Sequence, residues 1–172
     1  EVYLNSMVTA VEAGRVKVGE KWIDCDVAVW ATGVAASPLG KMIGDGTGAE
    51  IDRAGRVKVN KDLSVGEFAN VFVIGDMVNL MWEDGKIVPG VAPAAMQMAN
   101  LTAANILGDL KGKPRREFRY FDKGSMATIG RSRAIAETGR FKMTGFIAWL
   151  AWLFVHLISL IGFRNRIYVL SE

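Results

Sequence analysis

Cysteine and histidine are almost absent from this sequence, which contains only Cys25 and His156 in 172 residues. A single cysteine excludes an internal disulfide and a C-x-x-C redox pair, so a thiol relay within the chain is disfavoured. Cys25 is expected to be a small buried residue in a strand. A metal site needs several ligand side chains together, and none accompanies His156, so we predict packing or a hydrogen bond for it and no metal site.

A large charge excess is also missing. The 21 Lys and Arg residues outnumber the 18 Asp and Glu residues by three, and the basic clusters at residues 111–119, 131–142 and 164–166 flank apolar sequence. No nucleic-acid recognition motif accompanies them, so we expect no nucleic-acid partner. With 51% hydrophobic residues the chain can bury a core. It begins at Glu1 rather than at methionine, within sequence typical of strands, and we expect it to be part of a longer protein.

The first half of the chain alternates in a way that favours strands. Residues 2–18 predict a β-hairpin with a turn at residues 12–14, and residues 26–31 form an apolar run that predicts a strand buried on both faces. Residues 34–48 are rich in Gly, Ala, Ser and Pro, which indicates a linker with a short helix and a domain boundary near Val34. Val57 and Val59 alternate with lysines, as on a half-exposed strand, and residues 63–65 follow a turn.

The strongest strand and helix signals follow. Residues 70–76 form a β-branched and aromatic run that ends in Gly-Asp, the pattern of a central parallel strand. Residues 89–108 predict one helix, because Pro93 suits the first turn and Gly108 suits the end. After it, short runs at 119–121, 126–129 and 134–137 predict a small antiparallel β unit.

Asp76 is the leading candidate for ligand binding. A carboxylate directly after a central parallel strand lies in the crevice where open α/β sheets bind ligands, and Gly75 permits close approach. Its oxygens can accept hydrogen bonds from the hydroxyls of a ribityl or ribose chain. The following helix N-terminus would stabilise a flat ring that gains negative charge, and the residues near it are small, namely Ala92, Ala94 and Ala95. An ordinary Gly-Asp turn before an Ala-rich buried helix is the alternative interpretation.

Residues 71–76, followed seventeen residues after Asp76 by Pro93 and residues 94–97, resemble the type II NADH dehydrogenase family. The resemblance implies that Asp76 binds the ribityl chain of FAD. It also implies that residues 92–97 form the family's quinone-site motif A-Q-x-A-x-Q, in which Met96 lies beside the matching polar group, Gln97. Pro93 replaces the first glutamine of that motif and removes an amide that would contact the quinone.

Two further segments resemble the same family. Residues 27–33 are similar to the end of its NADH-binding domain, which assigns Ala31, Thr32 and Gly33 to cofactor binding, and residues 121–130 are similar to the element that opens its C-terminal domain. Lys123 would then approach flavin or quinone, unless it is a solvated turn residue. The implied domains are the end of an NADH-binding domain (1–33), part of an FAD-binding domain (34–112) and a membrane-associating domain (113–172). No G-x-G-x-x-G fingerprint occurs, so the segment alone is not expected to bind FAD well.

Residues 145–163 carry no charge. As a helix they would rise about 28 Å, which permits a transmembrane span. A helix lying in the membrane interface fits better, because Trp149, Trp152, His156 and Ser159 form one stripe and basic residues flank both ends. The residues expected to contact lipid are aromatic: Phe146, Trp149, Trp152, Phe154 and Phe163. A core helix or a dimer interface is the alternative.

The sequence thus predicts an α/β chain: a partial Rossmann-like FAD/NAD(P)-binding flavoprotein with a small antiparallel β unit and a C-terminal amphipathic membrane helix. The resemblance implies an enzyme that passes electrons from NADH through FAD to a membrane quinone without pumping protons. It would sit peripherally on the cytoplasmic side of the cell inner membrane, with a homodimer left open. The alternatives are a sulfide:quinone oxidoreductase, a soluble ferredoxin or rubredoxin reductase, and a membrane-anchoring or dimerising module without activity.

Overall fold

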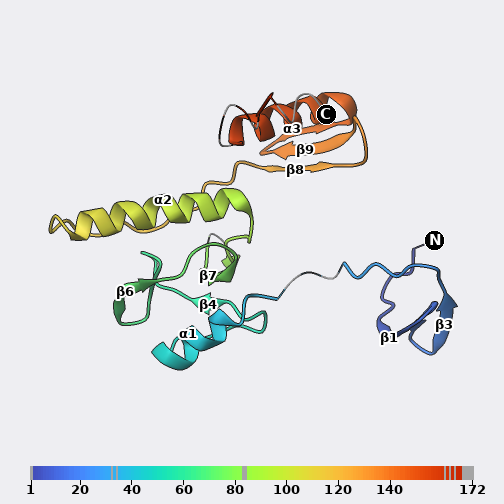
Figure 1. The fold of residues 1–172 in the computed structure, drawn as a ribbon, viewed down its shortest axis with the longest axis horizontal. Helices are drawn as coiled ribbons and strands as arrows, with labels where there is room; N and C mark the ends of the chain where they lie inside the picture. The colour runs from blue at the N-terminus through green and yellow to red at the C-terminus, as the bar shows by residue number, and fades with distance from the viewer. Residues whose placement is uncertain are drawn as a thin grey trace. The chain divides into compact units, whose positions relative to one another are not determined.

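The computed structural model describes residues 2–31, 33, 35–82, 85–160, 162, 164, 166 and 167. The chain divides into two compact units, residues 1–35 and residues 36–172. Figure 1 shows the strands of the first unit in blue and the elements of the second unit from cyan to red. The two units are described separately.

The first unit is a three-stranded antiparallel sheet in the order β1-β2-β3. Its strands are β1 (Val8–Glu12), β2 (Arg15–Val18) and β3 (Lys21–Asp24). The chain reverses at Gly14 and Gly19, where φ is 78° and 59°, a backbone conformation that glycine adopts without strain. The predicted hairpin with its turn at residues 12–14 is confirmed.

The prediction of a buried strand at residues 26–31 is wrong. These residues follow β3 without regular structure, and their side chains are exposed, Val29 to 84%. An apolar run becomes a central strand only when neighbouring strands pair with it and other elements cover both faces, and the described residues supply neither. Cys25 is partly buried but lies just after β3 rather than in a strand.

The second unit opens with small elements around one core. They are α1 (Leu39–Thr47), β4 (Val57–Lys58), β5 (Ser64–Val65), β6 (Phe68–Phe72), the 3₁₀ turn η1 (Gly75–Met77) and β7 (Val78–Asn79). Strand β4 pairs in parallel with β7, and β5 pairs antiparallel with β6. Val57 and Val59 are buried while Lys58 is exposed, which confirms the predicted alternation. The linker predicted at residues 34–48 contains α1.

The predicted central parallel strand at residues 70–76 is also wrong. Strand β6 ends at Phe72 and, within the described parts of the chain, pairs only with β5, in antiparallel orientation. Leu63 has a φ of 71° and turns the chain so that its carbonyl accepts a hydrogen bond from Val73 N–H at 3.2 Å. The apolar run therefore reflects burial of Val73 in the core and not a position in the middle of a sheet.

Helix α2 (Ala92–Asp109) confirms the predicted helix, with proline in its first turn. Its buried residues recur at steps of four, four and three, which is one helical face: Ala94, Met98, Thr102 and Asn105. Ala94 and Met98 belong to the core that β4 to β7 also line. After the helix the chain reverses and returns alongside it (Figure 1).

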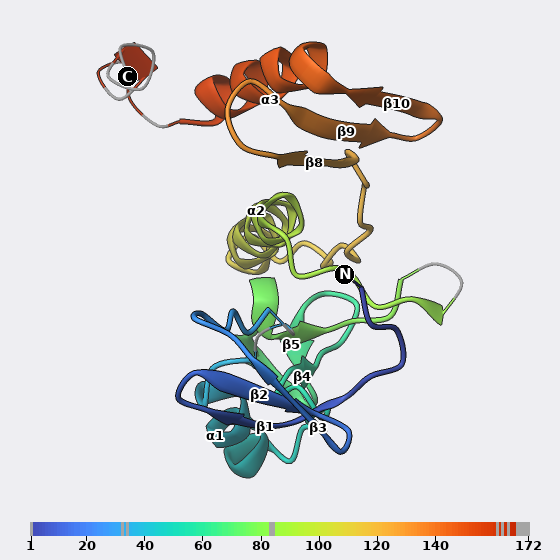
Figure 2. The same ribbon diagram turned by 90° about the vertical axis from the view of Figure 1, so that its right-hand side faces the viewer.

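The C-terminal part is a sheet covered by one helix. Strands β8 (Ser125–Thr128), β9 (Ala134–Thr138) and β10 (Phe141–Thr144) form an antiparallel sheet in the order β10-β9-β8, and α3 (Gly145–Ser159) lies over one face (Figure 2). The predicted antiparallel unit is present with a different third strand. Residues 119–121 form no strand, because hydrogen bonds to α2 hold them instead.

The tryptophans of α3 do not lie on the outward face where they were predicted to contact lipid. Trp149 and Trp152 turn toward the sheet and pack against the small buried residues Ala134, Ala136 and Ala148. The outward face consists of other apolar side chains, which are Phe146, Ile147, Leu150, Phe154 and Ile158, exposed by 46% to 69%. Phe163 lies outside the described residues. In the part of the chain that the structure describes, no helix is both long enough and apolar enough to cross a membrane.

Candidate functional site

The Gly75–Asp76 turn packs against the first turns of α2. Gly75 has a φ of 74°, and its N–H donates to Met98 Sδ at 3.2 Å. A Cβ atom placed on Gly75 would lie 3.5 Å from the Cβ of Ala95, so the space is ordinary and the backbone conformation is what requires glycine. The sequence placed Gly75 and the helix in one site, and the structure brings them together.

Asp76 presents an exposed carboxylate at this turn. Its Oδ1 atom lies 3.5 Å from where a Cβ on Gly90 would stand, so the loop before α2 passes beside it without side-chain bulk. Within the described residues no hydrogen bond or ion pair engages this carboxylate. The turn therefore offers free acceptor oxygens next to the start of α2.

The N-terminus of α2 has no side-chain cap. The N–H groups of Ala94 and Ala95 both donate to Val91 O, at 3.0 and 3.1 Å, and Pro93 has no N–H, so Ala92 carries the first unpaired donor. Ala92 is exposed, whereas Ala94 is 1% exposed and belongs to the core. The positive end of the helix dipole thus faces the Asp76 turn with Ala92 and Pro93 at its surface.

The residues predicted to contact quinone differ in how far they are exposed. Met96 is 62% exposed on the outer side of α2, and Lys123 is exposed in the loop before β8. Gln97 is partly buried, and its amide bonds the backbone of Phe121 twice: Nε2 donates to the carbonyl and Oε1 accepts from the N–H, each at 3.0 Å. Gln97 is therefore already engaged within the protein.

The residues assigned to the NADH-binding end lie in the first unit. Ala31 and Gly33 are exposed, and Gly33 has a φ of 101°. Thr32 lies outside the described residues.

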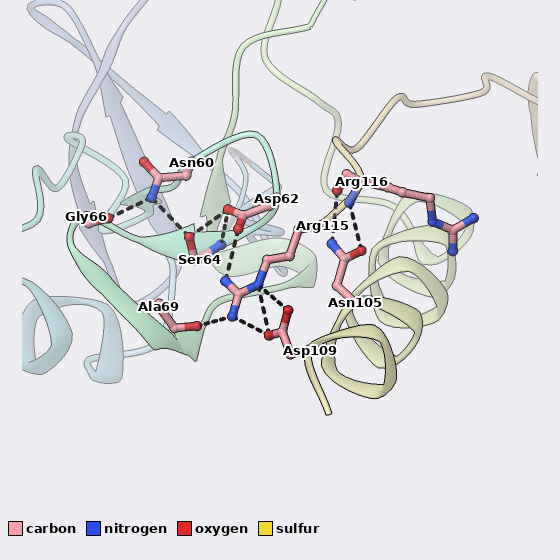
Figure 3. Close-up of polar contacts among 9 residues, drawn as sticks. All are labelled: Asn60, Asp62, Ser64, Gly66, Ala69, Asn105, Asp109, Arg115 and Arg116. Carbon is pink, nitrogen blue, oxygen red and sulfur yellow. Dashed lines mark hydrogen bonds and ion pairs between the residues drawn. The ribbon is translucent and has the colours of Figure 1, made fainter. Parts of the chain in front are cut away.

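Arg115 forms a clasp that the sequence did not single out (Figure 3). Its guanidinium donates to Asp62 at 3.0 Å, to Asp109 at 2.9 Å and to the carbonyl of Ala69 at 2.6 Å, and it lies 4.8 Å from the centre of the Phe72 ring. The clasp joins the last turn of α2 to the β5–β6 pair. Sequence showed only a basic cluster here, since the partners are as many as 53 residues apart.

The clasp changes the ionisation of its members. Partial burial raises the pKa of Asp62, but hydrogen bonds from Ser64 and Arg115 outweigh it, and the pKa falls below its ordinary value of 3.8. The hydrogen bond from Arg115 likewise lowers the pKa of Asp109, and the two carboxylates raise the pKa of Arg115. Asp109 is disfavoured by the negative end of the α2 dipole, and Arg115 offsets that.

The C-terminal part contains an open surface hollow of about 430 Å³ lined by Thr128, Gly130, Arg131, Ser132, Trp149 and Trp152. None of the candidate cofactor residues lines it. Across the described residues no group of three or more His, Cys, Asp or Glu side chains is placed to hold a metal ion.

Comparison with known proteins identifies the family. Residues 1–99 match the pyridine nucleotide-disulphide oxidoreductase family model, and residues 123–172 match the NDH2 C-terminal domain model. The type II NADH:quinone oxidoreductase NdhA of Mycobacterium tuberculosis is 51% identical over 180 residues, covering 99% of this chain and 37% of that protein. The chain therefore spans little more than a third of the length of this relative.

Two solved structures have a similar fold. NDH2 from Plasmodium falciparum in complex with NADH superposes with a TM-score of 0.74 at 16% identity, covering 95% of this chain and 48% of that chain. The sulfide:quinone oxidoreductase of Aquifex aeolicus gives a TM-score of 0.60 at 18% identity over 84% of this chain and 37% of that one. At these identities the likeness concerns the α/β fold alone. The family models and the close sequence relative together establish that the chain belongs to the pyridine nucleotide-disulphide oxidoreductase family, in its type II NADH:quinone oxidoreductase group.

Proposed function

We propose that this chain contributes the flavin-binding turn and part of the quinone route to an enzyme that transfers electrons from NADH through FAD to a quinone, without proton pumping. The observation that carries the proposal is the contact of the Gly75–Asp76 turn with the start of α2. A family likeness alone supports a fold. This contact supports a particular binding site, because it brings the acceptor oxygens of Asp76 close to the N-terminus of α2.

The residues present fit a flavin on three counts. Asp76 offers unengaged acceptor oxygens to sugar-chain hydroxyls, Gly75 and Gly90 leave the backbone accessible, and the uncapped N-terminus of α2 provides partial positive charge. Asp76 would hold the ribityl chain, and Ala92 and Pro93 would face the ring, with buried Ala94 supporting them from the core. We assign Ala31, Thr32 and Gly33 to the region that carries NAD(H).

When bound, FAD accepts a hydride from NADH and passes two electrons to a quinone. The chain's own contribution is placement and electrostatics. Asp76 orients the sugar chain through hydrogen bonds, and the α2 dipole stabilises negative charge added beside its first turn. Pro93, Met96, Gln97 and Lys123 are proposed to border the quinone route.

The outward face of α3 supports attachment to a lipid bilayer surface. Apolar side chains exposed side by side, with Arg140 and Lys142 just before the helix, suit the boundary between headgroups and acyl chains. Phe146 and Phe154 lie on that face, whereas Trp149 and Trp152 would support it from beneath. We propose a peripheral position on the cytoplasmic side of the cell inner membrane, and a homodimer contact through the same face is the alternative to lipid binding.

Two alternative functions would need other residues of this chain. A sulfide:quinone oxidoreductase relies on cysteines beside the flavin, and this chain has only Cys25, which lies after β3 in the first unit. A purely membrane-anchoring or dimerising module needs α3 but not Asp76.

The test uses the full-length parent protein with its flavin. Anaerobic NADH should bleach the flavin absorbance, and a soluble quinone should restore it. Asp76→Ala should abolish flavin retention, while Asp45→Ala, which removes an exposed carboxylate from α1, should leave it intact. The proposal would be refuted if the parent protein held no flavin. It would also be refuted if sulfide reduced the flavin and NADH did not.

A further inference from the structure

A segment after α2 is strapped along that helix. Residues 115–121, here called the strap, run antiparallel to α2, and two side-chain amides of the helix bond its backbone. Asn105 donates to Arg116 O at 2.9 Å and accepts from Arg116 N–H at 3.0 Å, while Gln97 pairs in the same way with Phe121. Gln97 and Asn105 stand about 12 Å apart along the helix axis, within the roughly 17 Å that an extended strap spans between its two bonded residues.

The two ends of the strap are secured unequally. At the Arg116 end the Arg115 clasp adds to the Asn105 pair (Figure 3). The N–H of Phe118 also donates to Lys61 O at 2.7 Å. At the Phe121 end Gln97 is the only side chain among the described residues that bonds the backbone, and Tyr120 packs edge-on against Trp82 at 5.0 Å. Phe121 is therefore held by the Gln97 amide and by the burial of its neighbour Tyr120 in the core.

The Gln97 amide cannot move without loss. Its oxygen and its nitrogen each have a partner on Phe121, which sets the orientation of the amide group. A rotation toward another ligand would break both bonds and release the N–H and C=O of the exposed Phe121 to water.

Lys123 lies between two fixed points. On one side Gln97 holds Phe121, and Asp122 Oδ1 accepts from Gly124 N–H at 2.8 Å. On the other side Gly124 has a φ of 89° and sits so close to β9 that a Cβ atom there would collide with the carbonyl oxygen of Glu137. Only three peptide bonds separate Phe121 from Gly124, so a shift of Phe121 moves Lys123.

We propose that Gln97 is a positioning residue: its amide holds the strap on α2 without touching the quinone, and thereby sets the position of Lys123, which is proposed to border the quinone route. This inference rests on the proposed quinone reduction. It gives Gln97 a different role from the direct quinone contact that the motif suggests.

The test compares three variants of the flavin-loaded full-length parent. Gln97→Met keeps the length of the side chain and removes both bonds, and Gln97→Glu keeps the acceptor and removes the donor at neutral pH. Asn105→Leu is the matched control, because it removes the same kind of pair where the Arg115 clasp still secures the strap. The measurements are backbone amide exchange at Phe121 and Arg116, and quinone reduction with two quinones that differ in ring substituents.

We expect Gln97→Met to speed exchange at Phe121 about tenfold, the loss of roughly one hydrogen bond. It should slow quinone reduction by one common factor for both quinones. For Gln97→Glu, both the exchange rate at Phe121 and the rate of quinone reduction should lie between those of the wild type and Gln97→Met. This variant keeps the test decisive if the methionine variant does not fold. Asn105→Leu should speed exchange at Arg116 and leave quinone reduction within twofold of the wild type.

Three results would overturn the inference. Slower quinone reduction with unchanged exchange at Phe121 would mean that Gln97 contacts the quinone itself. Faster exchange with unchanged quinone reduction would mean that the strap has no role in the reaction. A wild-type parent that reduces no quinone would refute the proposed function as well, so the two failures are distinguishable.

Discussion

Helices α2 and α3 are both nearly free of charge, yet they occupy opposite environments. Asp109 is the only charged residue in α2, and α3 has none. Helix α2 buries one face in the core and carries the strap on another side. Helix α3 has one fully buried residue, Ala148, and leaves large apolar side chains exposed.

The difference shows how much composition leaves open. In α2 the polar groups Gln97 and Asn105 are used by the backbone of a neighbouring segment, so an uncharged helix becomes internal scaffolding. In α3 no segment of the described chain covers the outer face. An exposed apolar face of this kind marks an interaction surface, and we propose lipid as its partner.

The largest expected effect on the free energy of unfolding comes from removing the contact of α2 with the core. Met98 is 1% exposed and lies among Val57, Leu63 and Val65 in the same cluster. Met98→Ala should lower the free energy of unfolding by about 2–5 kcal/mol, through lost burial and a cavity. Ile147→Ala on the outer face of α3 should change it by less than about 0.5 kcal/mol in detergent. Urea unfolding of the full-length parent measures the change in both variants. Equal changes in Met98→Ala and Ile147→Ala would contradict the inferred difference in burial between α2 and α3.

The next effect concerns the clasp at the end of α2. Arg115→Met should lower the free energy of unfolding at neutral pH by about 1–3 kcal/mol, since it leaves the partly buried carboxylate of Asp62 without its cation. Lys61→Met is the control, because its ion pair with Glu117 is largely exposed and should contribute little.

The clasp has a defined pH dependence. The pKa values of Asp62 and Asp109 are lowered in the folded protein, so their stabilisation is present above the unfolded value near 3.8 and is lost as the pH falls through the folded values. The difference between wild type and Arg115→Met should stay constant from about pH 8 to 5 and shrink only below 3.8. Unfolding at a series of pH values measures it, and a loss centred near pH 6 would contradict this assignment.

The smallest expected effect lies on α3. Phe154 is 65% exposed, and Phe154→Ser should weaken binding of the full-length parent to anionic phospholipid vesicles roughly tenfold, because burying a phenylalanine in lipid is worth about 1.5–3 kcal/mol. Phe68→Ser removes an exposed phenylalanine from β6 and should leave binding unchanged. Equal loss in both variants would mean that the α3 face is not the lipid contact.

Local signals predicted the features that depend on local chemistry. The turn at Gly14, the alternation around Lys58 and the start of α2 near Pro93 follow from backbone preferences and side-chain periodicity. The proximity of Gly75 to α2 was also predicted, although for a parallel strand that is not there. The contact between Gly75 and α2 is observed, whereas the role of this place in cofactor binding stays a prediction.

Apolar runs misled where burial depends on distant partners. Residues 26–31 and 70–76 have the same composition as central strands, but the first lies exposed and the second packs into the core after β6. The tryptophans of α3 were predicted on its outer side, and they pack inward because small alanines of β9 leave room for large rings. None of these outcomes is visible in a single segment.

The sequence by itself determined which residues can turn, cap and alternate, and it carried the motif that identifies the family, because those properties depend on neighbours a few positions away. Only the tertiary structure decided that Arg115 would clasp Asp62 and Asp109, and that Gln97 would hold Phe121. These contacts join residues 6 to 53 positions apart. Their geometry exists only after the chain has reversed at the end of α2, which no local preference encodes.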